Sequence, residues 1–458
     1  MRPTSKSDDI PFLGKLSLCR HGYKKLNMQE NLKKEIGTFG LASAVVNIMV
    51  GTGIFILPAL VAENLGATAI ICFFICGALI FLIALCFAEV GSKVNVSGGT
   101  YAYIENAFGP FAGFLANNIF WFGSCVLSDA AAANALAKTL GYFLPALDTE
   151  TVRPIFFLIL FGVLAYINIR GAKNGVRFIV FTAIAKLIPL LLIIGFGTGY
   201  ITVENLHWKV APALHDLGAS SLVLFYAFLG IETAVTNSGE FKNPSRTVPL
   251  GILSGLSFVL VLYIAIQLIS QGVLGDQLVA NKEAPLTAVS KLIFGNAGIT
   301  LVVVGTAISI LGALSGEILA IPRILFAGAR DGIFPKLLTK VHPKYTTPHI
   351  AIIFYSVLGF LLAVFGVFKQ LIILSSAATL LIYLGVVLAT IKMRLKRSGT
   401  GEKTFTIPGG IIIPLIATTT IIWLLSNLSI AEFTGIGIFI MILSLVFLAM
   451  KLFAAKKG

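Results

Sequence analysis

Apolar segments about as long as a lipid bilayer is thick recur from residue 38 almost to the end of this 458-residue chain. A helix needs roughly 20 apolar residues to cross the hydrocarbon core, and about twelve segments qualify. Hydrophobic residues make up 57% of the chain and charged residues 12%, which excludes a soluble domain of this size. We predict an all-α polytopic membrane protein, with spans centred near Met49, Leu79, Phe122, Gly162, Leu190, Ala227, Leu262, Ile308, Val357, Leu381, Thr419 and Ile442.

The positive charges are unevenly divided between the two sides of the membrane. When the loops are assigned alternately, the side that carries the N-terminus holds 27 Lys and Arg residues and the other side holds 6. By the positive-inside bias, both termini are predicted to be cytoplasmic, in a plasma or inner membrane. This bias also accounts for the net charge of +14, so no nucleic-acid partner is expected. Residues 1–35 are interpreted as a basic cytoplasmic tail.

The first apolar segment is interrupted in its middle by Gly51-Thr52-Gly53, and Pro58 follows. Glycine destabilises a helix interior, and irregular backbone at membrane depth is tolerated only where protein buries it or where it lines a cavity. The pattern favours a broken helix whose second half starts near Thr52, with free N–H groups and a positive dipole end that face an anionic group. A small-residue packing notch is the alternative.

The sixth apolar segment is interrupted in the same way, at Gly230, which Glu232 follows closely. A break in the first span of each five-helix block is typical of an inverted-repeat transporter with its site at the midplane. We therefore expect a ten-helix core over residues 36–392, with repeats over 36–200 and 214–392. Residues 404–454 are expected to form two peripheral helices, which could support a homodimer.

Enzyme chemistry finds little support in the sequence. All five histidines lie in predicted loops or in the tail, and there is neither an H-E-x-x-H helix nor a Walker A motif. Cys72 and Cys76 share a helix face, but no His or carboxylate joins them as metal ligands. We expect no enzymatic activity, no cofactor and no metal site.

Several motifs resemble those of one transporter family. They are GTGIF at 51–55, GGTYAY at 98–103, FYAFLGIE at 225–232, KNPSRTVP at 242–249 and ARDGIFP at 329–335. In these motifs and their order, the first ten spans resemble the amino acid–polyamine–organocation transporters, nearest to the bacterial basic-amino-acid and polyamine permeases.

The resemblance implies a binding mode for a zwitterion. The backbone N–H groups that would hold its carboxylate are those of Thr52, Gly53 and Ile54. The backbone carbonyls that would meet its ammonium group lie near Met49, Val50, Ala227 and Leu229. Tyr226 falls where the arginine antiporters of this family place a gating aromatic, although a core tyrosine is the alternative.

Ionisable residues inside predicted spans default to functional hypotheses, and four of them stand out. In proton-dependent relatives, a lysine similar to Lys186 replaces the sodium ion between spans 1, 5 and 8, so Lys186 is interpreted as the proton-coupling group. A fixed ion pair with a buried carboxylate is the alternative. By the same resemblance, Glu232 orders the broken helices or relays protons.

Asp129 and Glu317 depart from the family pattern, because the arginine antiporters carry an asparagine and an aromatic residue there. Two added acids would favour a cationic amino acid or a polyamine. Alternatively, one acid neutralises Lys186 or Arg323, or it carries a proton beside a neutral substrate.

The function expected from these features is secondary active amino acid transport by alternating access, driven by protons or by exchange. Its partners would be a small amino acid substrate, protons and the lipid bilayer. The alternatives are a neutral amino acid permease or a sodium-coupled symporter of the same fold, and a non-transporting amino acid sensor. A sensor would usually add a long soluble domain, which this sequence does not contain.

Overall fold

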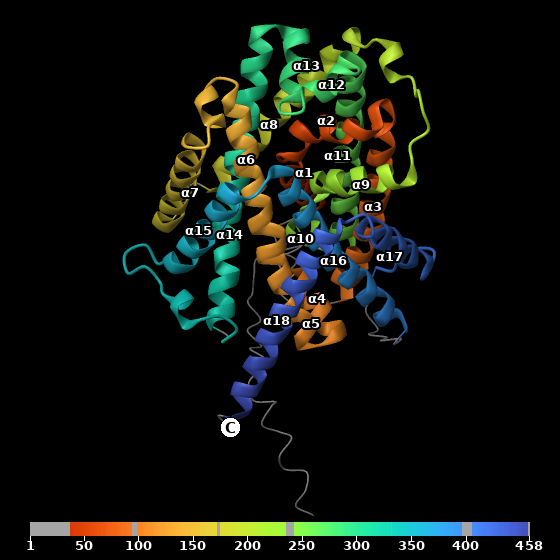
Figure 1. Cartoon of the computed structure of the whole chain (residues 1–458). Helices are drawn as coiled ribbons and strands as arrows, with labels where there is room; N and C mark the ends of the chain where they lie inside the picture. Colours follow the sequence, from red (N-terminus) through yellow and green to blue (C-terminus); the bar gives the residue numbers. More distant parts are fainter. Residues whose placement is uncertain are drawn as a thin grey trace, which may run out of the picture.

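The computed structural model describes residues 37–93, 99–171, 175–234, 242–330, 332–395 and 405–456. All regular structure in these ranges is helical (Figure 1). The predicted tail at 1–35 lies outside the described residues. The prediction of an all-α polytopic membrane fold is confirmed.

The helices follow one another along the chain with short connections. The first block contains α1 (Thr38–Met49), α2 (Gly53–Leu65), α3 (Ile70–Lys93), α4 (Gly99–Phe108), α5 (Pro110–Asn118), α6 (Leu127–Gly141), α7 (Val152–Arg170) and α8 (Gly175–Gly197). The second contains α9 (Leu214–Phe225), α10 (Ile231–Ala234), α11 (Pro244–Leu274), α12 (Gln277–Ala280), α13 (Pro285–Phe294), α14 (Asn296–Arg330), α15 (His349–Phe365) and α16 (Phe368–Leu395). Two further helices, α17 (Ile412–Leu425) and α18 (Ile430–Lys456), end the described chain.

Length and composition alone identify eight membrane-spanning candidates among the described residues, fewer than the roughly twelve expected. The difference has two physical causes. Some spans are broken into halves or are shorter apolar helices, such as α1, α15 and α17, and the candidate at Gly53–Ser92 joins α2 and α3. All twelve expected span centres nevertheless fall within helical segments.

The helix breaks predicted in spans 1 and 6 are both present. Residues 50–52 separate α1 from α2. In span 6, α9 passes through a 3-10 turn, η7 (Tyr226–Phe228), into extended Leu229 and then Gly230, whose φ is +126°. Only glycine adopts that φ readily. The two breaks touch: a Cβ added to Gly53 would lie 2.9 Å from the Cα of Ala227.

Span 3 contains a feature that the sequence did not signal, a π-helical segment, η3 (Ile119–Val126), between α5 and α6. Wide turns of this kind are frequent at functional sites. Here the segment brings Ser124 and Cys125 to the wall of the central cavity described below.

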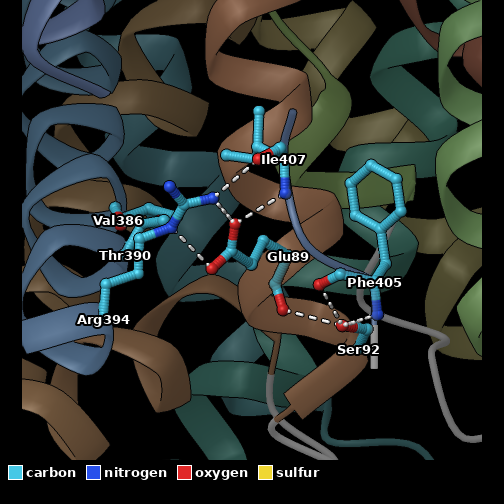
Figure 2. A network of polar contacts seen from close by, with 7 residues as sticks. All are labelled: Glu89, Ser92, Val386, Thr390, Arg394, Phe405 and Ile407. Atoms are coloured by element: carbon cyan, nitrogen blue, oxygen red, sulfur yellow. Dashed lines mark hydrogen bonds and ion pairs between the residues drawn. The ribbon is translucent and has the colours of Figure 1, made fainter. Parts of the chain in front are cut away.

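A buried polar network fixes the start of the peripheral region to the core (Figure 2). Arg394, near the end of α16, donates from Nε to Glu89 Oε1 of α3 at 2.8 Å, and the backbone N–H of Ile407 donates to Glu89 Oε2 at 2.9 Å. Ser92 Oγ lies 3.3 Å from the carbonyl and 3.1 Å from the N–H of Phe405. The segment leading into α17 is thus held by the ends of two core helices.

The last helix, α18, contacts the rest of the chain much less. Only 6% of its apolar window is buried. Its Phe447 ring packs against Phe111 and Phe114, with ring centroids 5.2 and 5.3 Å apart. Its remaining apolar surface suits lipid or a second copy of the chain; the homodimer stays a prediction.

Candidate functional site

A cavity of about 80 Å³ lies between the two helix breaks. Eight of the twelve residues predicted for the site line it: Met49, Thr52, Gly53, Asp129, Tyr226, Leu229, Glu232 and Glu317. Three others, Val50, Ile54 and Ala227, are buried beside the breaks but are not on the cavity wall, and Lys186 lies on a neighbouring helix. The fold therefore brings together residues separated by more than 260 positions in the sequence.

The start of α2 supplies polar backbone groups to this cavity. Thr52 is its N-cap residue, and no side chain caps the helix there. The first N–H groups of a helix have no partner within it, and the dipole gives this end a partial positive charge. An uncapped helix start on a cavity wall suits a carboxylate.

Tyr226, in η7, also lines the cavity. Its hydroxyl lies 3.2 Å from Ser128 Oγ, on α6, and 3.3 Å from the Ser128 carbonyl oxygen, to which it donates. The aromatic ring therefore joins η7 to α6 across the cavity.

Tyr263, on α11, is a residue that sequence reasoning missed. Its hydroxyl donates to the carbonyl of Met49 at 2.7 Å and lies 3.0 Å from the carbonyl of Ala227. These are two of the carbonyls predicted to meet an ammonium group. The Met49 carbonyl also accepts a hydrogen bond from the N–H of Gly51 at 2.7 Å. Tyr263 thus ties the two broken helices together. A tyrosine within an apolar span is usually a core residue, so nothing in the sequence singled it out.

Glu232 orders the second break. Its Oε2 accepts a hydrogen bond from the N–H of Gly230 at 3.1 Å and another from the hydroxyl of Tyr383, on α16. The carboxylate is buried, and it occupies the start of α10, where the helix dipole favours a negative charge. Tyr383 was also missed in the sequence.

Two carboxyl groups from different helices meet at the cavity. Asp129 of α6 accepts a hydrogen bond from the hydroxyl of Tyr355 at 2.9 Å and interacts with the Glu317 carboxyl of α14. Glu317 Oε2 is buried without a hydrogen-bond partner among the described residues. Adjacent buried carboxylates repel each other, so this part of the cavity favours a cation or a proton.

Neither acid neutralises a basic residue in the described part of the chain. Lys186, 5% exposed on α8, donates from Nζ to the carbonyl of Asn47 in α1. Arg323 donates to the carbonyl of Leu319 in its own helix. The fixed ion pair considered as an alternative for Lys186 is not present among these residues.

Two larger hollows flank the cavity on opposite faces. One of about 450 Å³, at the α4–α5 end, shares Glu232 and Thr233 with the central cavity. The other, of about 660 Å³, shares none of its described lining residues with it. Glu63 lines this second hollow and pairs with two lysines, Lys282 at 3.2 Å and Lys369 at 3.1 Å. Of these two hollows, the one on the face predicted to be cytoplasmic shares described lining residues with the central cavity, and the other does not.

Comparison with known proteins places these features in context. A family model described as amino acid permease matches residues 36–450. A serine/threonine exchanger of Bacillus subtilis is 29% identical, over 90% of this chain and 94% of that protein. A branched-chain amino acid permease of the same organism is 26% identical, over 87% and 89%. The mouse b(0,+)-type amino acid transporter 1 is 27% identical, over 86% and 82%.

Proposed function

Because this chain belongs to the amino acid permease family, within the amino acid–polyamine–organocation superfamily, we propose that it moves an amino acid across the cell membrane by alternating access. The observation that carries the proposal is the cavity between the two helix breaks. Its wall includes the uncapped start of α2 for a carboxylate and the Met49 and Leu229 region for an ammonium group. We propose that both termini are cytoplasmic, because Lys and Arg are concentrated in the loops on the side of the N-terminus.

We propose a cationic amino acid or a polyamine as the favoured substrate. Asp129 and Glu317 both line the cavity, no basic side chain among the described residues neutralises them, and one Glu317 oxygen lacks a partner. A buried acceptor without a partner is costly, and a cationic side chain would satisfy it.

A neutral amino acid is the second candidate. The cavity is small, about 80 Å³, which favours a short side chain. Two of the relatives are named for serine and threonine or for branched-chain amino acids. In that case, one proton held between Asp129 and Glu317 would take the place of the substrate cation.

Transport by purified protein in proteoliposomes tests these candidates. Radiolabelled L-arginine, L-serine, L-leucine and putrescine are offered with and without an inward proton gradient. We expect saturable L-arginine uptake, which Glu317→Gln reduces more strongly than any uptake of L-serine. Glu204→Gln, which removes an exposed carboxylate away from the cavity, is the control. Binding without flux for every probe would favour a sensor instead.

We propose Lys186 as the proton-coupling group. Its amine donates a hydrogen bond to the Asn47 carbonyl just before the break in span 1. Loss of its proton would weaken this hydrogen bond between α8 and α1. Lys186→Met should abolish the pH dependence of accumulation while the protein still binds substrate. Accumulation with an unchanged pH dependence would rule out this role, and a requirement for sodium in the unmodified protein would favour the symporter alternative.

A further inference from the structure

The hollow of about 450 Å³ that adjoins the central cavity, called here the inner vestibule, contains polar groups that the proposed transport cycle does not yet use. It lies between α4, α5, α10 and α14, on the face predicted to be cytoplasmic. We propose that the inner vestibule is a second binding site for a zwitterionic amino acid, where Arg323 holds the carboxylate and Glu105 the ammonium group. This inference rests on the proposed transport function.

Three acidic or basic side chains line the vestibule, and none of them forms an ion pair among the described residues. Glu232 accepts hydrogen bonds from the Gly230 N–H and the Tyr383 hydroxyl. This leaves Arg323 and Glu105 available to a ligand.

Arg323 hydrogen-bonds only to the Leu319 carbonyl of its own helix, within the part of the chain that the structure describes. The Glu105 carboxyl takes part in no ion pair or hydrogen bond with another described residue. It packs over Gly113, where an added Cβ would lie 2.7 Å from Glu105 Cβ. Burial raises the pKa of the Glu105 carboxyl.

Two neutral polar side chains of the vestibule each have a buried oxygen without a hydrogen-bond partner among the described residues. Asn117 of α5 is 9% exposed and Thr100 of α4 is 7% exposed, and both line the vestibule. The two oxygens are Asn117 Oδ1 and Thr100 Oγ1. Buried polar atoms of this kind are rare and are usually satisfied by water or a ligand. With Glu105, they give the vestibule wall several acceptors for an ammonium group.

The rest of the wall is apolar, with Phe120, Ile321 and Ile324 among its members. Such a wall accommodates an aliphatic chain or the carbon stem of a longer side chain. A concave site with apolar walls and a few convergent polar groups is typical of small-molecule binding.

The second site lies on the route between the central cavity and the face predicted to be cytoplasmic. Glu232 and Thr233 line both the central cavity and the vestibule. A substrate that leaves the central cavity towards this face therefore passes the vestibule, and one that enters from this face for exchange meets it first. The site should affect binding from the inner face and leave binding from the outer face unchanged.

Sided transport kinetics test the proposal. KM is measured with radiolabelled L-arginine and L-serine in right-side-out and inside-out membrane vesicles from the same cells. Removing a charge-assisted hydrogen bond should raise KM about tenfold. We expect this rise at the inner face for Arg323→Gln and Glu105→Gln, with outer-face KM unchanged, and a smaller rise for Arg323→Lys.

Lys336→Gln is the matched control, since it removes an exposed positive charge on the same face but outside the vestibule. Normal uptake at the outer face shows that each variant is folded. An unchanged inner KM in both charge-removing variants, or an equal rise at both faces, would overturn the second site. Absence of transport by the unmodified protein would instead refute the proposed function.

Discussion

The two glycines of the Gly51-Thr52-Gly53 motif should respond very differently to alanine. A Cβ at Gly53 would lie 2.9 Å from the Cα and 3.0 Å from the Cβ of Ala227, in η7. Because Ala227 has no rotatable side chain, α2 and η7 must move apart. A Cβ at Gly51 would meet nothing closer than 3.9 Å.

The size of the effect follows from this geometry. Overpacking a tight contact costs about 1–3 kcal/mol, and alanine at a helical position regains up to about 1 kcal/mol relative to glycine. With about 2 kcal/mol taken for the overpacking cost, the net cost is about 1–2 kcal/mol, which corresponds to a roughly 5- to 30-fold weaker binding constant. Gly51→Ala avoids the steric cost, so its effect should stay within about threefold, as expected below about 0.6 kcal/mol.

Initial uptake of radiolabelled amino acid into proteoliposomes, at substrate concentrations well below KM, measures this difference. Thermal unfolding of each variant in detergent shows whether lost uptake reflects lost folding. We expect Gly53→Ala to reduce uptake 5- to 30-fold and Gly51→Ala to retain it. If the two variants behave alike, or Gly51→Ala is the more damaging, then contact between the two breaks does not build the site.

Three further substitutions test other contacts. Glu89→Gln leaves Arg394 without its anion, which costs about 3–5 kcal/mol for a buried pair; an unchanged unfolding temperature would contradict the structural role of this network (Figure 2). Gly230→Ala should abolish uptake, because alanine rarely adopts a φ of +126° and its Cβ would clash with Ile48. Near-normal uptake would show that Gly230 does not have this conformation in the working transporter. Glu63→Gln breaks two partly exposed ion pairs, with Lys282 and Lys369, typically worth about 0.5 kcal/mol each. Their sum of about 1 kcal/mol limits the change in outer-face KM to about fivefold, and to less in high salt; a larger change would show that these pairs contribute more than surface ion pairs do.

The fold class could be predicted because it depends on local properties. The length of each apolar segment determines whether a helix can cross the membrane, and the lipid interior leaves few other options for the backbone. The glycines at 51, 53 and 230 indicated the breaks because glycine has a low helix propensity, which depends little on the rest of the fold. The four ionisable candidates followed from similar reasoning, since an ionisable group within a span is costly unless it has a use. The backbone groups of the two breaks and Tyr226 were named because of the family resemblance.

Only the tertiary structure decided which of these groups meet. Asp129 and Glu317 lie on helices far apart in the sequence, and packing alone brings their carboxyl groups together beside Tyr355. The same holds for Tyr263, which joins both breaks, since a tyrosine in a span has no local signature of a long-range hydrogen bond. The sequence does not distinguish the two glycines of the motif. In the structure, Gly53 is in close contact with Ala227 and Gly51 is not. Segment length and residue type act locally, whereas a contact depends on how every intervening helix packs.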